Sequence, residues 1–159
     1  MVPWSGNTQR VLERKLYCEI LRPMKKGYWS GAHTKHRLRY HLVWIPKYRK
    51  RVLRGKIASH LKMLFYQACE VNEWWIDELA IQEDHVHMLI QLKPDKSISE
   101  VVQMLKGGSS KIIRETHPEL EEFLWGDHFW AEGYFAETVG VLHEKTIKEY
   151  IRSQREGNQ

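Results

Sequence analysis

Cysteine is scarce in this 159-residue chain: there are two, Cys18 and Cys69, and they form no Cys-x-x-Cys pair. The scarcity argues against a disulfide framework or a zinc knuckle and favours reduced thiols in a cytoplasmic protein. No apolar run approaches the length that crosses a bilayer, and no secretory signal pattern is found. Repeats and low-complexity segments are absent as well. The length suits one domain with a modest core.

A net charge of +5 at pH 7 favours a polyanionic partner. Basic residues are concentrated just after Pro46, in a stretch made of Lys47, Arg49, Lys50, Arg51 and Arg54, with Tyr48 interleaved. We predict that this basic stretch contacts the phosphates of a nucleic acid. The alternative is an ordinary solvated helix face. Seven tryptophans are many for this size, and we expect them in the core or stacked on bases.

Hydrophobic periodicity predicts an α+β fold. Alternation indicates strands over 37–45, 74–82 and 85–92, and the last two are separated only by Glu83 and Asp84, which predicts a tight antiparallel hairpin. Helical spacing indicates helices over 51–72, from Ser97 or Ser99 to about 116, and over 143–154, while 128–139 suits one or two short strands. This order predicts a ferredoxin-like (RRM-like) sandwich, an antiparallel sheet with helices packed on it.

Residues 1–23 have only weak helical spacing and are followed by Met24. We expect them to be an N-terminal extension without a catalytic role, ahead of a single domain over 24–159. The alternative is a peripheral helix that packs on this domain.

Two histidines, His85 and His87, flank Val86 in the third predicted strand. Since side chains alternate along a strand, the two imidazoles point to one face while Val86 and Met88 point to the other, toward a core. Two adjacent imidazoles on a rigid strand form half of a divalent-metal site. The alternative is a pair of exposed or hydrogen-bonded histidines at a strand end. Asp84 is either an ordinary turn residue or a carboxylate that orients one of the histidines.

Tyr150 and Gln154 lie four residues apart in the last predicted helix, so they share a helix face. A tyrosine beside a metal-bound phosphodiester is a suitable nucleophile, and the Gln154 amide oxygen is a suitable third ligand to the metal. Imidazole and amide ligands suit a labile Mg²⁺ or Mn²⁺ site better than a closed zinc site. The alternative gives Tyr150 a packing role and leaves Gln154 on the solvated surface.

Gly107 and Gly108 fall in the middle of the helix predicted to end at about 116. A glycine pair at such a position costs about 2 kcal/mol relative to alanine. One explanation is a kink or close packing. The other is close approach of a DNA backbone, with phosphate bound by Lys106, Ser109 and Ser110.

Several segments in this order resemble a known family: 40–49 (YHLVWIPKYR), 84–87 (DHVH), 105–110 (LKGGSS), 133–135 (GYF) with 138–140 (TVG), and 150–154 (YIRSQ). From about residue 31 to 154 the chain resembles the HUH single-tyrosine transposases of small single-strand DNA insertion sequences, the transposase-A type. Residues 1–23 fall outside the resemblance.

The resemblance implies a prokaryotic enzyme, cytoplasmic and acting at the nucleoid, that cleaves and rejoins single-stranded DNA. Tyr150 would form a 5′-phosphotyrosine, with Mg²⁺ or Mn²⁺ held by His85, His87 and Gln154. It also implies recognition of hairpins near the element ends and a homodimer with composite active sites, in which Gly140 is a hinge before the Tyr150 helix.

Three other functions stay open at this point. A non-catalytic nucleic-acid-binding module would use the same basic stretch and aromatics. A metal-dependent hydrolase would use the two histidines and water, without Tyr150. A domesticated relative that processes repeat hairpins would keep the same chemistry.

Overall fold

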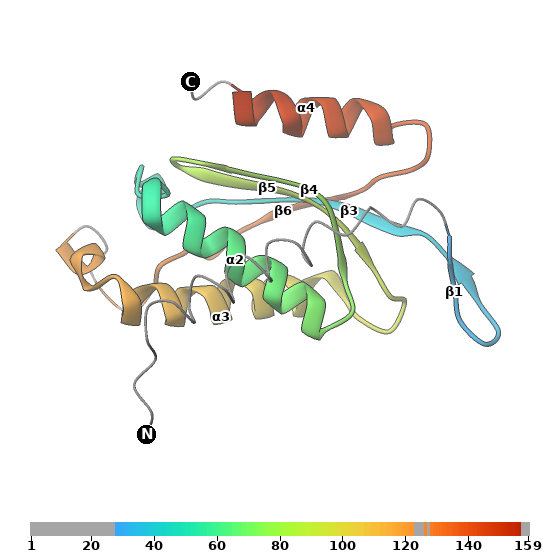
Figure 1. Cartoon of the computed structure of the whole chain (residues 1–159), viewed down its shortest axis with the longest axis horizontal. Helices are drawn as coiled ribbons and strands as arrows, with labels where there is room; N and C mark the ends of the chain where they lie inside the picture. The colour runs from blue at the N-terminus through green and yellow to red at the C-terminus, as the bar shows by residue number, and fades with distance from the viewer. Residues whose placement is uncertain (1–27, 123–125, 127, 157–159) are drawn as a thin grey trace, which may run out of the picture.

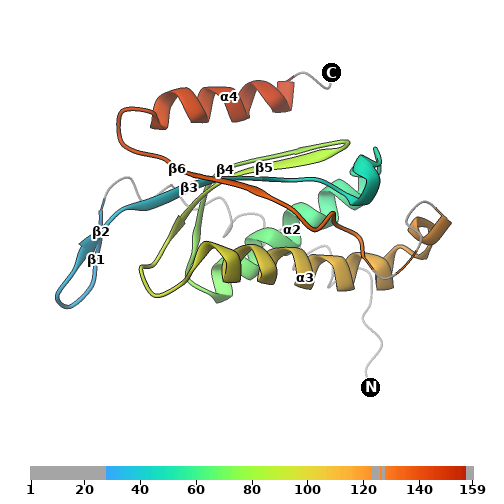
Figure 2. The same ribbon diagram turned by 180° about the vertical axis from the view of Figure 1, so that it is seen from behind.

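The structure, a computed structural model, describes residues 28–122, 126 and 128–156. Its main sheet has the strand order β4-β5-β3-β6, and all of its neighbouring strands are antiparallel. Helices α2 and α3 lie on one face of the sheet and α4 lies on the other (Figure 1, Figure 2). The sheet strands are β3 (Leu38–Trp44), β4 (Trp75–Gln82), β5 (His85–Leu92) and β6 (Phe135–Thr138), and the helices are α2 (Gly55–Val71), α3 (Ile98–Thr116) and α4 (Glu144–Glu156).

This arrangement confirms the predicted α+β fold. The order β3-α2-β4-β5-α3-β6, with α2 and α3 on one face, is that of a ferredoxin-like sandwich. The remaining elements are a small hairpin of β1 (Trp29–Ser30) and β2 (Lys35–His36), and two 3-10 helices, η1 (Lys47–Arg49) and η2 (Pro118–Glu122). The predicted extension, residues 1–23, lies outside the described residues. Within the part of the chain that the structure describes, no helix is long and apolar enough to cross a membrane.

The main core lies between the sheet and helices α2 and α3. Strand β5 contributes Val86, Met88 and Ile90, which are completely buried, and β3 contributes Leu42 and Trp44. Each helix covers them with apolar side chains from one of its faces: Leu61 and Phe65 from α2, and Val101, Val102, Leu105 and Ile113 from α3. Full burial of each of the larger side chains contributes about 1.5–3 kcal/mol, so this face of the sheet anchors the fold.

Helix α4 covers the other face through a smaller apolar cluster. Ile151 is completely buried against Ala80, Leu89 and Val139, with Ile147 partly buried beside them. Ion pairs fix both ends of the helix: Glu144 pairs with Arg37 and Arg39 at the start, and Arg152 and Arg155 pair with Glu78 of β4 near the end. The small apolar area and the large share of charge distinguish this interface from the main core.

Helix α2 begins at Gly55, four residues later than predicted. The backbone of Arg54 is extended (φ −127°, ψ 158°), and the Leu53 amide donates to the Glu83 carbonyl at 3.0 Å. The basic stretch therefore lies in η1 and the following loop, against the turn between β4 and β5, and not on a face of α2. Plain solvated surface stays the alternative to phosphate binding. Tyr48 and Arg49 adopt positive φ values (58° and 50°), a conformation that costs non-glycine residues about 1–2 kcal/mol.

Helix α3 begins with a capping box, since the Ser97 side chain accepts from the Glu100 amide and Glu100 reaches back to the Ser97 amide. The helix runs without interruption through Gly107 and Gly108, so the pair does not mark a break in α3. A Cβ at either glycine would meet nothing within 4 Å among the described residues. Close packing within this part of the chain therefore does not explain the pair, and the approach of a DNA backbone stays a prediction.

Candidate active site

Strand β5 presents His85 and His87 to the side of the sheet that faces α4, as the alternation predicted. The two rings lie 4.8 Å apart between centroids and are nearly perpendicular, at 85°. His87 is 6 % exposed, and its neighbours Val86 and Met88 are fully buried on the opposite face. A rigid strand with a packed core beneath it thus holds both imidazoles.

Asp84 combines the two roles that the sequence left open for it. It lies in the tight turn between β4 and β5, and its Oδ1 is 2.6 Å from Nδ1 of His85. Arg49 Nε–H donates to the other carboxylate oxygen at 3.0 Å. Partial burial disfavours ionisation, but these hydrogen bonds outweigh it and lower the pKa of the Asp84 carboxyl. An ionised Asp84 orients the His85 ring and leaves its Nε2 atom directed outward.

His87 contacts a buried histidine of β3, His41, to which the sequence analysis gave no role. Its Nδ1 lies 3.1 Å from Nε2 of His41, and Nδ1 of His41 lies 3.0 Å from Oε1 of Glu137. Burial, together with nearby His85 and His41, lowers the pKa of His87 to about 4. His87 is therefore neutral at physiological pH, which is the form that binds a metal ion.

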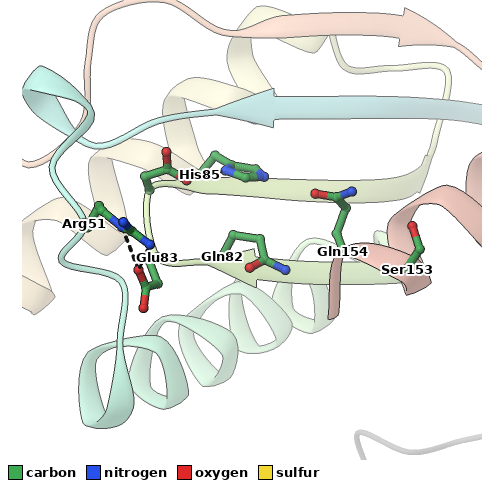
Figure 3. Close-up of a pocket in the computed structure, with 7 residues that line it drawn as sticks. Arg51, Gln82, Glu83, His85, Ser153 and Gln154 are labelled. Atoms are coloured by element: carbon green, nitrogen blue, oxygen red, sulfur yellow. Dashed lines mark hydrogen bonds and ion pairs between the residues drawn. The ribbon is translucent and has the colours of Figure 1, made fainter. Parts of the chain in front are cut away.

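Helix α4 brings Tyr150 beside the histidines. The Tyr150 ring lies 5.4 Å from the His87 ring and 6.3 Å from the His41 ring, edge-on to both. Its side chain is 46 % exposed, so a substrate can reach it. One turn further along α4, Gln154 faces a cavity of about 180 Å³ that His85 also lines. The cavity lies between the β4–β5 turn and the end of α4, and the Gln154 amide extends over it toward the His85 strand (Figure 3).

The donor atoms of His85 and Gln154, which line this cavity, and of the neighbouring His87 fit a labile divalent cation. The hydrogen bonds to His85 and His87 run through Nδ1, so each ring has Nε2 for a ligand bond. The described residues contain no group of three His, Cys, Asp or Glu side chains that could hold a metal ion, so a site on these two histidines would be completed by other oxygen donors, such as an amide or water. Gln154 supplies such an oxygen on the same cavity. Two imidazoles, one amide and water would make an open site for a labile divalent cation and not a closed structural zinc site.

The basic stretch borders the same cavity, which Arg51 lines together with Glu83. Arg51 and Arg54 form ion pairs with Glu83, as Arg49 does with Asp84, and all three arginine side chains are more than half exposed. Exposed pairs of this kind contribute about 0–1 kcal/mol, so a phosphate can replace them at little cost. Lys50 is exposed, and the Lys47 ammonium lies 5.2 Å from the centroid of the Tyr48 ring.

The residues around the glycine pair of α3 have structural partners instead of an open surface. The Lys106 ammonium donates to the carbonyls of Ala131, Glu132 and Gly133 at 2.6–3.1 Å, and burial lowers its pKa. Ser109 is 4 % exposed; its hydroxyl donates to the Leu105 carbonyl and accepts from Trp130. We therefore correct the prediction that Ser109 binds phosphate, because its burial leaves no surface for an anion. The hydrogen bonds of Lys106 hold the loop before β6, and phosphate binding by Lys106 stays a prediction.

Ser110 and Gly140 keep their predicted roles as untested hypotheses. Ser110 is partly buried, and its hydroxyl accepts from the Phe129 amide at 3.3 Å. Gly140 lies in the exposed connection between β6 and α4, and a Cβ there would meet nothing within 4 Å among the described residues. This conformation alone therefore gives no steric reason for glycine, and a hinge at Gly140 remains a prediction.

The fold and site together define a class: a ferredoxin-like domain with a histidine pair on its central sheet and a tyrosine on a helix laid over it. The model of the family described as "Transposase IS200 like" matches residues 34–154, and the chain belongs to this family. The protein is thus a transposase that binds DNA and whose family cleaves and transfers DNA strands.

Individual relatives agree with this assignment. The chain is 35 % identical over 127 residues to the ISDra2 transposase TnpA of Deinococcus radiodurans, covering 80 % of this chain and 91 % of the relative. It is equally similar (35 % over 127 residues, 80 % and 83 % coverage) to the transposase for insertion sequence element IS200 of Salmonella typhimurium.

Two solved structures resemble the fold. A crystal structure described as a candidate transposase from Deinococcus radiodurans has a TM-score of 0.66 at 31 % identity, covering 80 % of this chain and 98 % of the other. The structure of a REP-associated tyrosine transposase bound to a REP hairpin has a TM-score of 0.56 at 12 % identity, covering 82 % and 70 %. The second likeness concerns the fold alone.

Proposed function

We propose that this transposase cleaves and rejoins single-stranded DNA at insertion-sequence ends through a covalent bond to Tyr150. The observation that carries the proposal is the position of Tyr150, half-exposed beside His87, with Gln154 of the same helix across a cavity from His85. A non-catalytic binding module has no need of this convergence, and a hydrolase has no need of the tyrosine. The direct test is a denaturation-resistant protein–DNA adduct.

The proposed reaction balances without a co-substrate. Tyr150 Oη attacks the phosphorus and loses its proton to solvent, while the bond to the 3′ oxygen breaks. That oxygen takes up a proton and becomes a free 3′-OH, and the 5′ phosphate stays on Tyr150. A 3′-OH later attacks the phosphotyrosine and restores the phenol, so the free energy of the phosphodiester is conserved and no ATP is needed.

His85, His87 and Gln154 would hold the divalent cation, Mg²⁺ or Mn²⁺, that such chemistry requires. When bound, the cation would neutralise charge on the nonbridging phosphate oxygens and favour the phenolate form of the nucleophile. The protein's part is to hold the two imidazoles neutral and oriented, as the contacts of Asp84 and His41 support, and to place Tyr150 on an ordered helix. Positioning of this kind accounts for much of the rate in phosphoryl transfer.

We propose that the substrate is single-stranded DNA with hairpin ends, bound by the basic stretch. The stretch leads from β3 to the rim of the cavity, so a strand that follows it enters the site from one side. The likeness in fold to a transposase bound to a REP hairpin supports this choice of ligand. The ion pairs that the basic stretch forms with Glu83 and Asp84 would exchange for phosphate contacts when DNA binds.

Replacing Lys50 and Arg51 with alanine should weaken hairpin DNA binding and reduce its salt dependence. Each lost phosphate contact removes about one unit from the slope of log Kd against log salt concentration. Titrations by fluorescence anisotropy at several salt concentrations measure this slope. Lys96→Ala is the matched control, because Lys96 is exposed but follows the opposite end of β5. An unchanged slope in the double variant would mean that the stretch is only solvated surface.

We propose further that the protein works as a homodimer in which α4 can dock on its own sheet or on that of its partner. The structure describes one chain, with α4 over its own β4 and β5. Its interface is small and rich in charge, and it follows an exposed connection at Gly140, features that suit a helix able to exchange between subunits. Composite active sites would then form, with histidines from one subunit and Tyr150 from the other.

Mixing His87→Ala protein with Tyr150→Phe protein distinguishes the two arrangements. Each variant is inactive alone, but a mixed dimer with exchanged helices has one site with intact histidines and an intact Tyr150. We expect part of the wild-type cleavage, up to about a quarter for random pairing, to return on mixing. Subunit exchange is verified separately by energy transfer between labelled subunits. If the subunits exchange and no cleavage returns, α4 acts on its own chain.

A further inference from the structure

Behind His87 lies a chain of hydrogen bonds that ends in a carboxylate. Glu137 of β6 is directly opposite His41 of β3 in the antiparallel register, and its Oε1 lies 3.0 Å from His41 Nδ1. His41 Nε2 lies 3.1 Å from His87 Nδ1, with the two rings nearly parallel at 13°. His41 is 5 % exposed, and the Phe135 ring packs edge-on against it at 6.0 Å. The His41 ring, at the centre of these hydrogen bonds, is therefore held in place on several sides.

The carboxylate sets the direction of the hydrogen bonds in this series when Glu137 is ionised and His41 carries one ring proton. The carboxylate then only accepts, so Nδ1 of His41 carries the proton and donates to Glu137. Nε2 of His41, the other nitrogen of the neutral imidazole, accepts, and Nδ1 of His87 donates to it. The lone pair of His87 is then on Nε2. Asp84 acts on His85 in the same way, but directly.

We propose that His41 and Glu137 are positioning residues that hold His87 in the tautomer with a lone pair on Nε2, ready to bind the divalent cation. This inference rests on the proposed function of His87 as a metal ligand. His41 does not touch the DNA or the cation in this scheme, and it acts only through His87.

The tautomer can be read without metal or DNA. In the full chain labelled with ¹⁵N-histidine, two-bond ¹H–¹⁵N correlation spectra at pH 7.5 distinguish the proton on Nδ1 from the proton on Nε2. A His87→Asn variant identifies the His87 signals among those of the nine histidines. We expect the wild-type His87 proton on Nδ1. A wild-type His87 with its proton on Nε2 would overturn the proposal, whatever the cleavage assays of Tyr150 show.

Variants of His41 then separate positioning from simple packing. His41→Phe keeps a ring against Phe135 but offers no acceptor, so His87 should lose its fixed tautomer, and the Kd for Mn²⁺, measured by electron paramagnetic resonance, should rise about 10–100-fold. His41→Gln keeps an acceptor oxygen and should stay within about threefold of wild type. Restoration by Gln is not expected of a residue that only fills space.

Glu137→Ala gives an independent test at a half-exposed side chain, where folding is not at risk. It should raise the Kd for Mn²⁺ in the same direction as His41→Phe, and Glu115→Ala on the exposed side of α3 is the matched control. If His41→Phe fails to fold, the wild-type spectrum and Glu137→Ala decide the question. If the His87 tautomer and the Mn²⁺ affinity are unchanged in Glu137→Ala and in folded His41→Phe, His41 and Glu137 have no positioning role.

Discussion

Tyr150→Phe should form no covalent adduct with hairpin DNA, a loss of at least about 10³-fold relative to wild type. The substitution removes one hydroxyl from a side chain that is 46 % exposed, so folding and DNA affinity should be nearly unchanged. The measurement is a denaturing gel after incubation with end-labelled single-stranded DNA and Mn²⁺. Tyr134→Phe is the matched control, because Tyr134 is similarly exposed (42 %) and has no ring contact with His87.

Adduct formation by Tyr150→Phe at the wild-type level would assign the nucleophile to another residue. Cleavage without any adduct would instead indicate water as the nucleophile and favour a metal-dependent hydrolase. The two outcomes differ on the same gel, since only the first leaves labelled DNA on the protein.

His87→Ala and His85→Ala should each abolish metal-dependent cleavage, again by about 10³-fold or more. Each substitution removes one of the two imidazoles that β5 would present to the cation, and the described residues hold no group of three metal-binding His, Cys, Asp or Glu side chains from which another site could form. Gln154→Ala should be milder: water can replace one amide oxygen, so more Mn²⁺ should restore part of the rate.

The rate of adduct formation against Mn²⁺ concentration separates these cases. His60→Ala is the control, since His60 of α2 also contacts a second histidine, His117, but at the C-terminal end of α3, on the other face of the sheet. EDTA should stop wild-type cleavage. Full cleavage in EDTA would contradict the metal assignment, and full activity of His85→Ala would remove that residue from the ligand set.

Local patterns in the sequence predict much of the fold and part of the site. Strand β5 has the predicted bounds, because strict alternation and a two-residue turn leave little freedom in register. The face shared by His85 and His87 follows from the same alternation. Tyr150 and Gln154 share a helix face at one-turn spacing, which the α4 helix retains.

Non-local contacts account for what the sequence analysis missed. The role of His41 depends on Glu137, 96 residues later, through the pairing of β3 with β6. The burial of Ser109 depends on Trp130, and the late start of α2 depends on a bond from Leu53 to the β4–β5 turn. The alternation of polar and apolar residues along β3 puts His41 on the polar face of that strand. Only the strand order β5-β3-β6 reveals that it stands between His87 and a carboxylate.

One measurement tests the central claim most directly: which half of a cleaved strand remains on Tyr150. A hairpin-bearing single strand carries different dyes at its 5′ and 3′ ends, and the adduct formed with Mn²⁺ is digested and mapped by mass spectrometry. The account predicts that the 3′-end dye stays with a peptide containing phosphorylated Tyr150, while the fragment with the 5′-end dye is released with a free 3′-OH. Retention of the 5′-end dye, or attachment at any other residue, would contradict it.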